Sequence, residues 1–154
     1  MDLAKNLKIE SVDRLTPSKP VVLKPQDTVA DAVRQMQERR IGCVVICLDR
    51  PVLGIFTERD LINRVLTPGR SLDLPLSSVM TPEPMTVQRK EPIAQAMKRM
   101  QKGGYRHLPV VDENGRPVGM LSIKRIVHYI VEHYPFVANV PPTPDPFFQV
   151  REGA

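Results

Sequence analysis

The chain carries one short pattern twice, and this duplication constrains its fold more than any other feature. Residues 54–61 and 119–126 both begin with glycine, continue with two apolar residues and a hydroxyl residue, and end on an apolar residue. The second copy starts 65 residues after the first in a chain of 154 residues. Such a period indicates two copies of one supersecondary unit, which pack together to bury their apolar faces.

The residues before each pattern predict a strand and then a helix. Each copy opens with a Thr-Pro pair, Thr16-Pro17 or Thr81-Pro82, and a short apolar stretch typical of an edge strand follows. Next comes an apolar stripe at i, i+3, i+4 and i+7, which predicts a helix with one face packed in the core. Its members are Val29, Ala32, Val33 and Met36 in the first copy, and Ile93, Ala96, Met97 and Met100 in the second.

A hairpin and a closing helix complete each copy. The predicted hairpin strands are residues 43–46 with 52–56, and 108–111 with 117–121. The closing helices are predicted at about residues 58–66 and 123–133. The fold class is therefore α+β, with two β-α-β-β-α repeats related by pseudo-two-fold symmetry.

The repeats divide the chain into four parts. We assign residues 1–14 to an N-terminal segment, 15–70 to the first repeat and 71–134 to the second. Residues 135–154 are rich in proline and have no helical or strand period, so we expect an extended or disordered tail of unassigned role.

Composition narrows the class of protein. The net charge of +5 comes from 22 basic and 17 acidic residues without a block of like charges, which suits an anionic small ligand as well as nucleic acid. No apolar run is long enough to cross a membrane, so we expect a soluble cytoplasmic protein without a membrane partner. Cys43 and Cys47 are expected to be buried, reduced thiols, and no metal site is predicted because other ligands do not cluster nearby.

The duplicated unit resembles a pair of cystathionine β-synthase (CBS) domains, the Bateman module, of the stand-alone prokaryotic type. The resemblance covers about residues 12–134 and rests on the Thr-Pro pairs, on residues 54–60 and on residues 106–112. It implies a sensor of adenosine compounds, such as AMP, ADP, ATP, NAD, S-adenosylmethionine or a diadenosine polyphosphate. Such a sensor regulates a partner protein and needs no cofactor beyond this ligand.

The turn after residue 56 carries the chemistry that would hold a nucleotide. Thr57 stands at a helix start, where unpaired backbone N–H groups and the helix dipole favour a phosphate, and Arg59 adds a cation. Asp60 can accept hydrogen bonds from two ribose hydroxyls through its two oxygens. The resemblance assigns five further residues to nucleotide binding: Thr16, Pro17, Arg106, His107 and Ser122.

Simpler roles exist for these residues. Residues 57–60 also form a Thr-x-x-Asp capping box, which would do no more than start a helix. Arg106 and His107 could be an exposed arginine and a partly buried histidine at a strand end.

The second copy differs from the first at its equivalent turn. It keeps a hydroxyl at Ser122 but has Arg125 where the first copy has Asp60. A guanidinium only donates hydrogen bonds, so it cannot accept from ribose hydroxyls, and with Lys124 it favours a phosphate or another anion. We therefore predict one adenosine site per chain, although drift in a helix cap would explain the same difference.

Two other functions compete with ligand sensing. A nucleic-acid-binding protein is suggested by the sequence pI near 9.5, although the helical charges suit a solvated surface equally well. A structural dimerisation module without a ligand is the other alternative. We do not expect this protein to be an enzyme, because its sequence lacks the common catalytic motifs. We expect a homodimer in which the helices at 29–37 and 93–100 offer their Met and Ala positions to a second copy.

Overall fold

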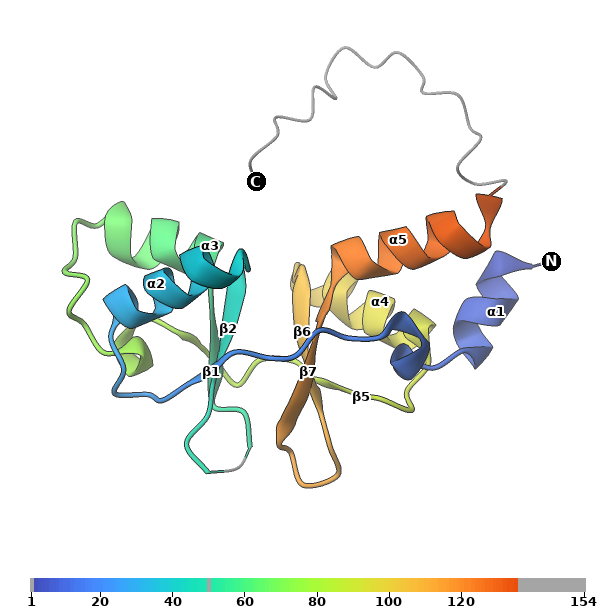
Figure 1. The fold of residues 1–154 in the computed structure, drawn as a ribbon, viewed down its shortest axis with the longest axis horizontal. Helices are drawn as coiled ribbons and strands as arrows, with labels where there is room; N and C mark the ends of the chain where they lie inside the picture. The colour runs from blue at the N-terminus through green and yellow to red at the C-terminus, as the bar shows by residue number, and fades with distance from the viewer. Residues whose placement is uncertain (1, 50, 136–154) are drawn as a thin grey trace, which may run out of the picture.

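The computed structural model describes residues 2–49 and 51–135, so the predicted tail from residue 136 onward lies outside the described residues. Two sheets stand side by side at the centre, with helices on their outer sides (Figure 1). The first sheet has the order β1-β2-β3-β4 and the second β5-β6-β7. Their strands are β1 Val22–Leu23, β2 Cys43–Ile46, β3 Gly54–Thr57, β4 Thr81–Pro82, β5 Val87–Gln88, β6 His107–Val111 and β7 Pro117–Ser122.

The helices follow the predicted order in both halves. The α-helices are α1 Leu3–Ile9, α2 Val29–Arg39, α3 Glu58–Asp60, α4 Ile93–Gly103 and α5 Ile123–His133. Two short 3₁₀ turns, η1 Val12–Leu15 and η3 Leu76–Ser78, precede the repeats, and a π-helix, η2 Leu61–Leu66, continues α3. The predicted β-α-β-β-α succession is therefore confirmed twice, and the fold class is α+β.

The two apolar stripes pack in the cores of their repeats. Val29, Ala32 and Met36 are buried in the first core, and Ile93, Ala96 and Met100 are buried in the second. The prediction of core packing is confirmed for these six residues. Four of the Met and Ala side chains expected to face a second copy are thus buried, whereas Ala30, Ala94 and Met97 are half-buried.

The segment that opens each repeat lies on the sheet of the other repeat. Strand β4, which leads into the second repeat, pairs antiparallel with β3 of the first, with Ile55 opposite Thr81. In the same way Ser18 forms a bridge to Met120 of β7. The chain thus crosses between the halves twice.

These crossings explain the glycine that starts each repeated pattern. A Cβ atom on Gly54 would lie 2.9 Å from the Thr81 carbonyl oxygen, and one on Gly119 would lie 3.0 Å from Pro17 Cβ. The separation at Gly54 is too short for a side chain, and the one at Gly119 is tight enough that Pro17 would have to move, so glycine lets the crossing segment approach each strand this closely.

The N-terminal segment belongs to the second core, a placement that the sequence patterns do not predict. Leu7, Val12 and Leu15 are buried there, as Leu76 and Val79 are buried in the first core. The backbone N–H of Val12 donates to the Glu91 carbonyl at 2.8 Å, and the N–H of Leu76 donates equivalently to Asp27 at 2.8 Å. Each repeat is thus completed by the residues that precede the other repeat.

A small apolar cluster joins the two sheets. Cys43, Val45 and Ile55 of the first repeat pack there with Met120 of the second. Cys43 and Cys47 are buried thiols, as predicted. Burial is the main cause that raises the pKa of Cys43 to about 12, so its thiol stays protonated. Within the described ranges, no helix is long and apolar enough to cross a bilayer.

Candidate functional site

A first cleft opens where β3 ends and β6 begins, between the two repeats. Its volume is about 290 Å³. The first repeat contributes the start of α3 and the π-helix, the crossing strand β4 contributes Thr81, and the second repeat contributes the end of α4 and the residues leading into β6. Its polar side chains are Thr57, Glu58, Arg59, Asp60, Asn63, Arg64, Thr81, Tyr105, Arg106 and His107.

Asp60 is the buried acid of this cleft, with only 6% of its surface exposed. Its Oδ2 accepts from the backbone N–H of Thr57 at 3.0 Å and from the Thr57 hydroxyl at 3.1 Å. Its backbone N–H donates to Thr57 Oγ1 at 3.2 Å, which completes the predicted capping box. Its Oδ1 accepts from the Thr81 hydroxyl at 2.9 Å. Asp60 therefore both caps a helix and links that helix to the crossing strand.

Arg64 adds a cation to the same carboxylate. Its Nε lies 3.4 Å from Asp60 Oδ1, and its Nη1 donates to the Met80 carbonyl at 2.8 Å. Arg64 follows Asp60 by four residues, in the π-helix that begins directly after Asp60. Single π turns often occur at functional sites, where they redirect one side chain.

The opposite wall comes from the second repeat. Arg106 is exposed and His107 is half-buried, as one reading of the sequence anticipates. Burial lowers the pKa of His107, Glu58 opposes this shift, and Lys124 and Arg106 add to it. The two walls also touch directly, because Arg59 Nη1 donates to the Gly104 carbonyl at 3.5 Å.

The start of α3 has fewer unpaired backbone N–H groups for binding an anion than the sequence suggests. The N–H of Thr57 donates to Asp60, the N–H of Glu58 donates to the Gly42 carbonyl at 3.1 Å, and the N–H of Asp60 donates to Thr57. The expectation of unpaired N–H groups is therefore wrong for these three, since the capping box and a neighbouring loop satisfy them. The side chains of this cleft must supply most of the attraction for a phosphate.

A second cleft lies beside the first and is larger, about 770 Å³. It shares Gly42, Glu58, Arg106 and His107 with the first cleft. Four cationic side chains and one acidic side chain line it: Lys19, Arg40, Arg106, Lys124 and Glu58. Ser122 caps α5 by accepting from the Arg125 N–H at 3.3 Å, but residue 125 supplies no carboxylate to complete a capping box. The second cleft is thus basic where the first has a buried acid.

The predicted site residues separate into three groups. Thr57, Arg59, Asp60, Arg106 and His107 lie together around the first cleft. Ser122 and Lys124 line the second cleft, together with Arg106 and His107. The remaining three line neither cleft: Thr16, Pro17 and Arg125.

Sequence reasoning missed five polar residues of the first cleft: Glu58, Asn63, Arg64, Thr81 and Tyr105. Thr81 belongs to the Thr-Pro motif, but the crossing of the chain assigns this second copy of the motif to the first cleft. Ser18 and Lys19, which follow the first copy, line the second cleft. For Arg64 the available signal was its i+4 spacing from Asp60 on a predicted helix, which favours an ion pair. For Asn63 no comparable signal was available. Among the described residues, no group of three or more His, Cys, Asp or Glu side chains is arranged to hold a metal ion.

Comparison with known proteins agrees with this architecture. The family model of the CBS domain matches residues 11–67 and 76–132. An uncharacterized 17.7 kDa protein of Acidianus ambivalens is 32% identical over 122 residues, which are 79% of this chain and 73% of that protein. A CBS domain-containing protein of Arabidopsis thaliana is 31% identical over 112 residues, but these cover 72% of this chain and only 20% of the plant protein.

Solved structures show the same fold. A CBS-domain containing protein of Agrobacterium tumefaciens is 35% identical, with a TM-score of 0.70, and the match covers 78% of this chain and 98% of that one. A CBS domain protein of Pyrobaculum aerophilum, solved in complex with AMP, is 25% identical, with a TM-score of 0.73 and coverage of 82% and 99%.

Proposed function

This chain belongs to the CBS domain family, and from that premise we propose that it is a regulatory sensor that binds one adenosine nucleotide per chain in the first cleft. Ligand binding would then act on a partner protein. The match to the Pyrobaculum aerophilum protein, which was solved with AMP, supports an adenosine ligand.

The observation that carries this proposal is the position of Asp60. Its carboxylate lies in the cleft between Thr57 and Thr81, where Oδ1 can accept from a ribose hydroxyl beside the hydrogen bond from Thr81. Arg106 and His107 stand on the facing wall and supply donors for a phosphate. The second cleft has cations without an equivalent acid, so it suits an anion or the far phosphates of a long ligand.

Calorimetry of the whole chain tests this function. Adenosine, AMP, ADP, ATP, NAD and S-adenosylmethionine are titrated separately, and we expect at least one to bind with one adenosine per chain. Thermal unfolding gives an independent measure, because a ligand at a hundredfold its dissociation constant adds about 2.7 kcal/mol to stability. Two equivalent adenosine sites per chain would contradict the assignment of the first cleft, and binding by none of the six would contradict sensing of these compounds.

A homodimer is the second part of the proposal, and its surface differs from the one expected at first. Ile62 and Leu66 of the π-helix are about half exposed, and so are Val127 and Val131 of α5. The two pairs occupy equivalent positions 65 residues apart, and their helices lie on the same side of the two sheets (Figure 1). A two-fold axis that brings this side against a second copy would cover all four side chains.

Light scattering at several protein concentrations measures the dimer. Ile62→Glu should weaken dimerisation about tenfold or more, because the interface loses an apolar side chain and gains a charge. Leu48→Glu is the control, since Leu48 is similarly exposed, at 57%, but lies between β2 and β3, away from these helices. A parent chain that is monomeric at micromolar concentration contradicts the dimer. Equal effects of the two variants contradict the assigned surface.

A further inference from the structure

The carboxylate of Asp60 already has three hydrogen-bond donors and one cation around it in this structure. Two donors come from Thr57 to Oδ2 and one comes from the Thr81 hydroxyl to Oδ1. The Arg64 guanidinium forms an ion pair with Oδ1 at 3.4 Å. A carboxylate offers about four lone-pair positions in all, so a ribose hydroxyl that approaches the remaining position on Oδ1 must compete with Arg64 for that oxygen.

Arg64 is the neighbour of this carboxylate whose removal disturbs the protein least. Its Nε stands at 3.4 Å, farther from Asp60 than the three donors of the two threonines. Its side chain is 46% exposed, so water can solvate the guanidinium once it moves. The Thr57 donors, by contrast, hold the start of α3. We propose that Arg64 is a latch on the ribose position: it occupies Asp60 until adenosine binds, and the ribose hydroxyls then replace it.

The spacing from Asp60 explains why an arginine can serve this role. Arg64 follows Asp60 by four residues, a separation that places two side chains on the same side of a helix. Its counterpart 65 residues later is Tyr129, which is buried in the second core. The first repeat thus has a half-exposed cation beside its acid, whereas the second has a core residue at the equivalent position.

Movement of Arg64 away from Asp60 would also affect the segment that connects the two repeats. The same guanidinium donates to the Met80 carbonyl at 2.8 Å, immediately before β4. Ribose binding at Asp60 therefore removes a contact between the π-helix and the crossing strand. This proposal rests on adenosine binding in the first cleft and adds a regulatory residue to it.

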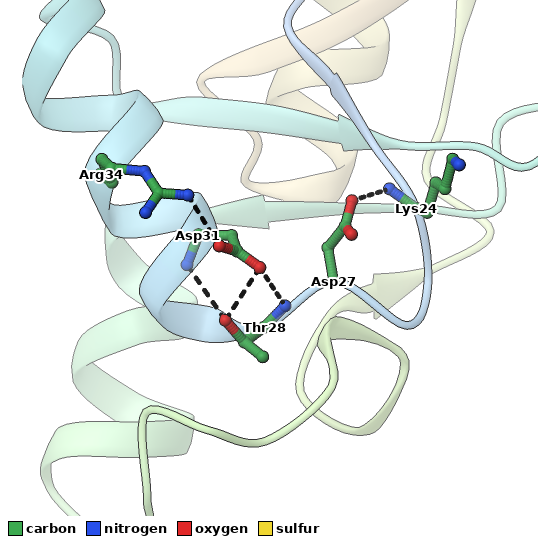
Figure 2. A network of polar contacts seen from close by, with 5 residues as sticks. All are labelled: Lys24, Asp27, Thr28, Asp31 and Arg34. Carbon is green, nitrogen blue, oxygen red and sulfur yellow. Dashed lines mark hydrogen bonds and ion pairs between the residues drawn. The ribbon is translucent and has the colours of Figure 1, made fainter.

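The chain contains a matched control at the start of α2. Thr28 and Asp31 form the same capping box, with the Thr28 N–H donating to Asp31 Oδ2 at 3.0 Å, and Arg34 pairs with Asp31 at 2.8 Å (Figure 2). Neither Asp31 nor Arg34 lines either cleft. Arg34→Met thus removes a comparable ion pair from a capping box without touching the site.

Calorimetry with adenosine, which carries no charge, measures the latch. We expect Arg64→Met to bind adenosine roughly two- to fivefold more tightly than the parent, because an ion pair of this exposure no longer competes for Asp60. Arg34→Met should bind as the parent does. Raising the salt from about 0.05 M to about 0.5 M should strengthen adenosine binding by the parent, since salt weakens the competing pair, and leave Arg64→Met unchanged.

The outcomes separate the latch from the proposed function. Adenosine binding by the parent with equal or weaker binding by a folded Arg64→Met overturns the latch alone. If Arg64→Met does not fold, the salt dependence of adenosine binding by the parent tests the latch instead. A parent affinity that does not rise with salt overturns the latch. If Arg64→Met binds adenosine and the parent does not, the result supports a latch in which Arg64 keeps the parent's Asp60 occupied. No binding by either protein overturns both the latch and the adenosine site.

Discussion

The two repeats share one fold, but the N-termini of their closing helices differ in charge and in capping. In the first repeat a complete capping box at Thr57 and Asp60 leads into a π-helix. In the second repeat Ser122 caps a regular α-helix that runs from Ile123 to His133, and Arg125 replaces the acid. One cleft therefore holds a buried carboxylate with a cation beside it, whereas the other has a mainly cationic lining.

This contrast teaches that two repeats with the same order of strands and helices can line their clefts with different charges. One substitution inside a helix cap preserves the strand-to-helix turn, because Ser122 still accepts the N–H of residue 125. The same substitution places a guanidinium where the first repeat has a carboxylate, and the Arg125 side chain lines neither cleft. The comparison can be tested by making each repeat resemble the other.

Removing the acid from the first repeat should have the largest effect. Asp60→Ala should weaken AMP binding roughly tenfold to a hundredfold, because one or two charge-assisted hydrogen bonds to ribose are lost. Asp31→Ala is the control, since it breaks the equivalent capping box of α2 outside both clefts. Both variants should lose stability because each breaks a capping box, but only Asp60→Ala should lose affinity in calorimetry. Unchanged AMP binding by Asp60→Ala would remove Asp60 from the site.

Adding an acid to the second repeat should have the next largest effect. Arg125→Asp restores the Ser-x-x-Asp spacing with a potential ribose acceptor, so AMP should bind with two sites per chain rather than one. The new site should be the weaker, because its larger cleft encloses a nucleotide less closely. Calorimetric stoichiometry measures this change. A variant that still binds one AMP would show that residues besides the acid exclude adenosine from this cleft.

The wall shared by the two clefts should produce a small dependence of stability on pH. Burial lowers the pKa of His107 below its ordinary value of 6.5, so the unfolded chain takes up a proton that the folded chain resists. The contribution of His107 to stability is thus fully present above about pH 6.5. It decreases below that pH, until the imidazole of the folded chain is protonated as well.

His107→Gln removes this contribution. Between about pH 7 and pH 5.5 the parent should lose roughly 1–2 °C more in Tm than His107→Gln. His128→Gln is the control, because the His128 side chain is 79% exposed. Thermal unfolding in matched buffers measures the difference, and identical pH profiles of parent and His107→Gln would show that burial of His107 does not affect stability in this range.

Most secondary structure could be read from local patterns. The helix predicted at 123–133 is the helix found, and both hairpins pair as expected, because apolar periodicity and turn residues act over short stretches. The closing helix of the first repeat was predicted with the right bounds, but its π geometry was not, since a one-residue expansion leaves the apolar pattern nearly unchanged. The packing of α1 against the second repeat was also missed, because its few apolar residues show no partner in the sequence.

The candidate site likewise has features that the sequence determined and features that only the tertiary structure decided. Sequence alone determined which side chains bear the chemistry of the turn, because Thr57 and Asp60 are neighbours in the chain and their capping box forms locally. The same holds for the replacement of the acid by Arg125. Only the tertiary structure decided that Thr81 joins the first cleft and that Thr16 and Pro17 do not. The physical reason is that strand pairing between distant segments depends on close backbone approach at Gly54 and Gly119, and only the folded chain shows which segment makes that approach.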